Sequence, residues 1–143
     1  MTRFLFWQRW LVGVGLVLTA FGLVLAVFSQ SPIMDLAFNQ RIDPVFWPGG
    51  EIPEEAHRFQ GFIYGVLGST VSGWGVMIAF LAAYPIRRRQ RWAWNCLALG
   101  MGLWYVVDTA FSASYQAFFN VGFNTLLLGL VMVPLIVTRG EFN

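Results

Sequence analysis

Four long apolar segments limit what this chain of 143 residues can fold into. They cover about residues 10–28, 61–84, 92–112 and 118–137, and three of them contain no charged residue. An α-helix needs about 20 consecutive apolar residues to cross the hydrocarbon core of a bilayer. The composition agrees, because 57% of the residues are hydrophobic and only 11% are charged. The sequence therefore predicts an all-α membrane protein, a single domain over 1–143 that forms a four-transmembrane-helix bundle with one longer outer loop at about 30–60.

The distribution of arginine predicts the orientation. The chain has nine arginines and no lysine. Two of the arginines, Arg41 and Arg58, lie in the outer loop beside five acidic residues, and the other seven fall together on the opposite side of a four-span chain. Because positive residues near membrane spans stay in the cytoplasm, we expect both termini to be cytoplasmic.

The segment 61–84 carries small residues at alternating spacings of four and three. Helices in lipid associate by close approach of their backbones, which small side chains permit. The first segment has a matching row of small residues, and shorter rows occur in the last two segments, around Gly102 and from Gly122 to Gly129. We therefore expect the segment 61–84 to lie at the centre of the bundle. The seam of small residues in that segment consists of Gly61, Gly65, Gly68, Ser72, Gly75, Ala79 and Ala82.

Asp108 is the only charged residue within the four segments. At 1.5 Å per residue it lies about 22 Å from the inner boundary of its helix, in the outer half of the bilayer. A carboxylate at that depth should face the bundle and have a partner. The expected polar cluster contains Asp108, Asn124, Asn120, Arg58 and Thr109, with His57 and Tyr115 at its rim.

Two interpretations of this cluster stay open. It is either a hydrogen-bond clamp that ties the last three helices together, or a protonation or ligand site open to the outer side. Trp74 and Trp104 lie near the middle of their segments, and they either fill space in the core or line a ligand pocket.

Several kinds of chemistry have no support. Cys96 is the only cysteine and His57 the only histidine, so the chain has no disulfide of its own, no bis-histidine haem and no standard metal spacing. No nucleophile motif, phosphate-binding loop or dinucleotide fingerprint occurs. Outside the apolar segments there is no basic patch with interleaved aromatic residues. We predict no cofactor, no metal, no nucleic-acid partner and no enzymatic activity.

The last third of the chain resembles uncharacterised small bacterial membrane proteins with four spans. The stretches that carry the likeness are 104–109, 119–125 and Pro134-Leu135, with a weaker likeness over 57–75. The resemblance implies a bacterial inner-membrane location and transfers no activity.

These features lead to two functional expectations. The first is a non-enzymatic accessory or scaffold subunit, or a homo-oligomer, that acts through glycine-rich helix packing; its partners are the lipid bilayer and other membrane subunits or copies of itself. The alternative is a protein that binds or transports a small molecule, lipid or ion through the cluster around Asp108.

Overall fold

The computed structural model describes residues 3–142, and within them all regular structure is helical. Four helices are long and apolar enough to cross a membrane. They are α1 (Arg3–Phe28), α4 (Glu54–Leu81, continued by the π-helical turn η2, Ala82–Ile86), α5 (Arg91–Ser114) and α6 (Phe118–Thr138, continued by the 3₁₀ turn η3, Arg139–Phe142). The predicted helical class is thereby confirmed for the described residues, and each predicted segment lies within one of these helices.

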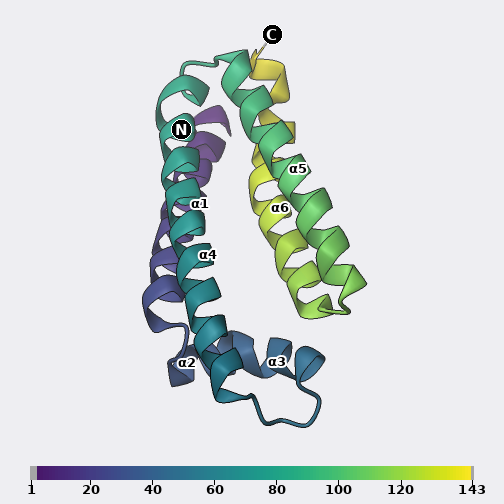
Figure 1. The fold of residues 1–143 in the computed structure, drawn as a ribbon. Helices are drawn as coiled ribbons and strands as arrows, with labels where there is room; N and C mark the ends of the chain where they lie inside the picture. The colour runs from purple at the N-terminus through teal and green to yellow at the C-terminus, as the bar shows by residue number, and fades with distance from the viewer. Residues whose placement is uncertain (1–2, 143) are drawn as a thin grey trace.

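The loop between α1 and α4 is also largely helical. It contains α2 (Pro32–Met34), the π-helical turn η1 (Asp35–Asn39) and α3 (Gln40–Phe46). Ser31 begins this stretch, because its side chain accepts a hydrogen bond from the Met34 amide and Pro32 fits the first helical position. Helix α3 crosses the end of the molecule opposite both termini (Figure 1).

Glycine holds α1 and α4 together. A Cβ atom added at Gly68 would lie 2.5 Å from the Ala26 nitrogen and the Gly22 oxygen, and one at Gly75 would meet Thr19 and the Gly15 oxygen. The two backbones therefore touch along the row of small residues that the sequence predicts for this pair. Ser72 belongs to the same contact, because a Cβ at Gly22 would meet its backbone nitrogen.

The seam is shorter than predicted. A Cβ at Gly61 would meet only the flexible side chain of Gln30, and one at Gly65 would meet nothing within 4 Å. The physical reason is that α1 ends at Phe28, soon after Ala26, which is the last α1 residue whose backbone meets a Cβ built on a glycine of α4. Glycines of the last two helices, at Gly102, Gly122 and Gly129, also have open space at the missing Cβ.

Helix α4 is not at the centre of a bundle, which corrects the expected arrangement. The described residues form two helix pairs, α1 with α4 and α5 with α6 (Figure 1). Helix α1 connects the two pairs by packing against α6, whereas α4 barely contacts α5. The seam of α4 is occupied by α1, and the exposed apolar side chains of α4 include Phe62, Val66, Met77 and Phe80.

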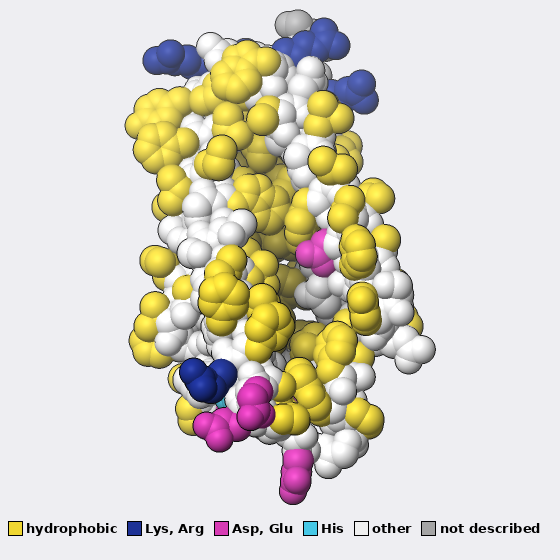
Figure 2. All heavy atoms as spheres, viewed as in Figure 1, with side chains coloured by type: hydrophobic (Ala, Val, Ile, Leu, Met, Phe, Trp, Pro, Cys, Tyr) yellow, Lys and Arg dark blue, Asp and Glu magenta, His cyan; other side chains and the backbone are white. Residues whose placement is uncertain are grey.

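The buried core lies in the half of the molecule that carries the termini. Leu11, Ile78, Met101 and Leu135, one from each long helix, are each at most 1% exposed. Basic side chains gather at that end of the molecule and acidic ones at the other (Figure 2). The far half has fewer buried apolar side chains, and it holds the candidate polar site.

Candidate functional site

The polar cluster is built by α5 and α6. Asp108 and Ser112 lie one turn apart on α5, and Asn120 and Asn124 lie one turn apart on α6. The Oδ1 atom of Asp108 accepts hydrogen bonds from Asn124 Nδ2 at 2.7 Å, from Asn120 Nδ2 at 3.0 Å and from Ser112 Oγ at 3.1 Å. The structure thus brings together the aspartate and both asparagines that the sequence places at one depth.

Further contacts fix the donors of this cluster. Asn120 Nδ2 also donates to Ser112 Oγ at 2.8 Å, and Asn124 Nδ2 lies 3.4 Å from Thr109 Oγ1. Asn124 is only 2% exposed, so its amide has no access to solvent in place of these bonds. The cluster therefore ties α5 to α6 through side-chain hydrogen bonds, where these two helices lack the glycine contact of the other pair.

The two oxygens of Asp108 differ in their surroundings. All three donors bond to Oδ1, and Oδ2 makes no hydrogen bond within residues 3–142. Asp108 lines a wide-open cavity of about 670 Å³ whose lining residues all belong to α5, among them Trp104, Val107 and Phe111. Figure 2 shows that the surface is hollowed between the two helix pairs. One carboxylate oxygen therefore accepts three hydrogen bonds, and the other has no donor among the described residues.

Trp104 forms part of the cavity wall and packs against Trp74 of α4. The two ring centroids are 5.2 Å apart with an interplanar angle of 56°. Both interpretations of these tryptophans thus apply to Trp104, since it fills space between α4 and α5 and also lines the cavity.

Two residues expected near the cluster, His57 and Arg58, lie elsewhere. His57 is held by Gln30, whose Nε2 lies 3.1 Å from His57 Nδ1, and Arg58 lines a different depression beside Gly61. Tyr115 lies on the turn after α5, where its ring is 6.1 Å from that of Phe46. Because α4 packs on α1, its first turns lie away from α5, and neither His57 nor Arg58 reaches Asp108.

Asp108 has no cationic side chain as a partner in the described part of the chain. The ion pair there joins Arg89 and Glu141 at the other end of the molecule, 3.1 Å apart. Within residues 3–142 no group of three His, Cys, Asp or Glu side chains is placed to hold a metal ion. What the cavity can do chemically is therefore set by the open carboxylate oxygen, which accepts a proton, a hydrogen bond or a cation.

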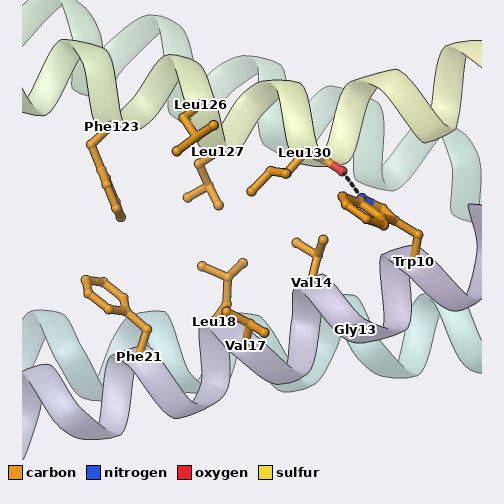
Figure 3. A pocket seen from close by; sticks show the side chains of 10 residues that line it. All are labelled: Trp10, Gly13, Val14, Val17, Leu18, Phe21, Phe123, Leu126, Leu127 and Leu130. Atoms are coloured by element: carbon orange, nitrogen blue, oxygen red, sulfur yellow. Dashed lines mark hydrogen bonds between the residues drawn. The ribbon is translucent and has the colours of Figure 1, made fainter.

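A second cavity, of about 440 Å³, lies between α1 and α6 and is almost entirely apolar (Figure 3). Trp10 closes one end of it by donating its Nε1–H to the Leu130 oxygen at 3.0 Å. At the other end, the rings of Phe21 and Phe123 lie 5.6 Å apart. The lining suits hydrocarbon and offers no group for acid–base chemistry. Sequence patterns missed this cavity because its residues do not differ from ordinary lipid-facing ones.

Comparison of the chain with protein-family models, with curated proteins and with solved structures finds no match.

Proposed function

We propose that this protein is a non-enzymatic, multi-pass protein of the bacterial inner membrane that binds or transports a small molecule or ion, with Asp108 as the group that receives a proton or a cation. The observation that carries the proposal is the asymmetry of this carboxylate. Three hydrogen bonds hold Oδ1 in place, while Oδ2 has no partner in the described residues and Asp108 lines an open cavity.

The energetic argument concerns charge in a medium of low polarity. An ionised carboxylate at membrane depth is costly unless it is paired, and intramembrane acids often mark ion or substrate pathways. A purely structural clamp would satisfy both oxygens, or would use asparagine, which makes the same bonds without a charge. The bonds to Asn120 and Asn124 hold the group in one geometry and leave its charge uncompensated, which favours an exchangeable proton or cation.

A hydrophobic carbodiimide provides the test, because this reagent enters membranes and reacts with protonated carboxyl groups. Protein in native membranes should acquire a stable adduct at Asp108, located by mass spectrometry of its peptides. Asp108→Asn should abolish this labelling. Glu54 and Glu55, which are exposed on the first turn of α4, are internal controls that should react with a water-soluble carbodiimide instead. An Asp108 that stays unlabelled at every pH would refute the proposal.

A second candidate function is an accessory subunit or a homo-oligomer. The glycine seam that first suggested it is used inside the chain by α1, so that seam does not support an external partner. The observation in favour is that α5 is the least covered of the four long helices, with Leu99, Leu103 and Val106 all exposed. Native mass spectrometry after extraction in mild detergent tests this candidate: a stoichiometric complex supports it, and a monomer rejects it.

A further inference from the structure

The end of the molecule opposite the termini holds a polar pocket that is separate from the Asp108 cluster. It has a volume of about 400 Å³ and lies where the helical loop meets the start of α4. Its wall combines acceptor groups with a few apolar side chains, and its residues are Asp35, Asn39, Gln40, Asp43, Pro44, Trp47, Gly50, Ile52 and His57.

Two carboxylates in this wall are each only half satisfied. Asp35 Oδ1 accepts a hydrogen bond from Asn39 Nδ2 at 2.7 Å, and Asp43 Oδ1 accepts one from Gln60 Nε2 at 2.6 Å. In residues 3–142 the second oxygen of each carboxylate makes no hydrogen bond, and neither acid belongs to an ion pair.

The neighbouring arginine does not neutralise these acids. Arg41 Nη1 donates to the backbone oxygens of Leu36 and Ala37, at 2.8 and 2.9 Å, and its guanidinium lies 5.3 Å from the centre of the Phe119 ring. The positive charge nearest in sequence is thus directed to other groups, and the pocket keeps an excess of negative charge.

Asn39 supplies an independent sign that a donor is missing. It is 4% exposed, and its Nδ2 donates both to Asp35 Oδ1 and to the Ser29 oxygen, the latter at 3.1 Å. Both partners are acceptors, which fixes the orientation of the amide. Its Oδ1 is then a buried acceptor without a partner, the only such side-chain atom in the described part of the chain. Buried polar atoms of this kind are rare, because an unmade hydrogen bond costs free energy.

We propose that this pocket binds a small organic ammonium ion. A primary ammonium group carries three N–H donors and a positive charge, which match the open oxygens of Asp35 and Asp43, and Asn39 with its unpartnered acceptor lines the same pocket. The alkyl part of the ligand would contact Pro44, Ile52 and the aromatic Trp47, whose ring also favours cations. A bare metal ion fits less well, since the described residues place no three metal-ligating side chains together. This proposal does not rest on Asp108.

Calorimetric titration of the full chain in mild detergent tests the inference. The probes are butylammonium, tetramethylammonium, which has the charge but no N–H donor, and butanol, which has neither the charge nor the amine. Butylammonium should bind, tetramethylammonium should bind at least roughly tenfold more weakly, and butanol should not bind. A charge-assisted hydrogen bond accounts for a difference of that size.

Matched variants locate the binding. Asp43→Asn and Asp35→Asn keep an oxygen for Gln60 and Asn39 but remove the charge, so each should weaken butylammonium binding roughly tenfold or more while leaving the melting temperature close to that of the wild type. Glu55→Gln removes the same charge from an exposed site outside the pocket and should leave the affinity unchanged. Asp108→Asn should also leave it unchanged, which separates this pocket from the proposed function.

Three outcomes would overturn the inference. They are an absence of butylammonium binding, an equal loss in Glu55→Gln and Asp43→Asn, and binding of Ca²⁺ that depends on Asp35 and Asp43 with no binding of the amine. The last outcome would assign the pocket to a metal ion instead.

Discussion

Replacement of Asp108 by asparagine or by leucine separates the fold of the cluster from its chemistry. In the wild-type protein Oδ1 of Asp108 accepts bonds from Asn124, Asn120 and Ser112 at 2.7, 3.0 and 3.1 Å. In Asp108→Asn the amide oxygen can take the place of Oδ1 and keep these bonds. The hydrogen bonds lose their charge-assisted character, which lowers the free energy of unfolding. The buried charge also disappears, which raises the free energy of unfolding. We expect a net change in the free energy of unfolding of less than about 1 kcal/mol.

Asp108→Leu removes the acceptor altogether. Asn120 keeps its bond to Ser112, but the amide of Asn124 retains only the 3.4 Å contact with Thr109 and is 2% exposed. An unsatisfied buried donor costs about 1–3 kcal/mol. Two of the three lost bonds, those from Asn120 and Asn124, join α5 to α6. Hydrogen bonds between helices in a membrane average about 0.6 kcal/mol, so the loss of these two amounts to about 1.2 kcal/mol, which lies within the range of the first figure. The leucine variant should therefore be about 1–2 kcal/mol less stable than the asparagine variant.

The assay has two parts, reversible unfolding in mixed detergent micelles and carbodiimide labelling of the same preparations. The asparagine variant should unfold like the wild type and lose the label. Equal destabilisation by asparagine and leucine would refute the hydrogen-bond reasoning. An Asp108→Asn protein that retains the binding or transport activity would refute the assignment of Asp108 as the group that changes charge.

Three further predictions concern packing and topology. Gly68→Ala adds a Cβ atom 2.5 Å from the backbone of α1 and should lower the free energy of unfolding by about 1–3 kcal/mol in the same assay. Gly65→Ala places its Cβ in open space and should be neutral or stabilising by up to about 1 kcal/mol. Equal effects of the two variants would refute the close contact of α1 and α4. Trp10→Phe keeps an aromatic ring but loses the bond to α6, so it should cost only about 0.6 kcal/mol, and a loss several times larger would mean that the indole ring itself holds α1 to α6. In a chain without its native cysteine, a cysteine at position 50 should react with an impermeant thiol reagent added to intact cells and one at position 89 should not; the reverse result would invert the proposed orientation.

The sequence was sufficient for the long helices and for half of the polar cluster. Apolar length is a local property, so the four segments could be located without knowledge of their neighbours. Asp108 meets Asn120 and Asn124 because α5 and α6 are joined by a short turn, which places the two helices antiparallel and brings residues of similar depth together.

The separation of α4 from α5 and α6 could not be predicted in the same way. Matching rows of small residues predicted that α1 and α4 approach closely, but such rows do not indicate whether further helices also pack on α4. Placing α4 at the centre led to the expectation that Arg58 reaches Asp108, and the contact with α1 prevents this. The unpartnered oxygen of Asn39 had no sequence signal, because it arises from the irregular path of η1 between α2 and α3.

The location of both polar sites follows from how the helix pairs are held. Near the termini, side chains from all four long helices interlock, as Leu11, Ile78, Met101 and Leu135 do. Farther along, α1 and α4 are held by backbone contact at Gly22 and Gly68, and α5 and α6 by the bonds to Asp108. Aromatic contacts, such as that of Phe21 with Phe123, join the two pairs there. In that half Asp108 lines an open cavity on α5, and no cationic side chain among the described residues pairs with it. This arrangement favours exchangeable ligands over fixed ion pairs at these acids.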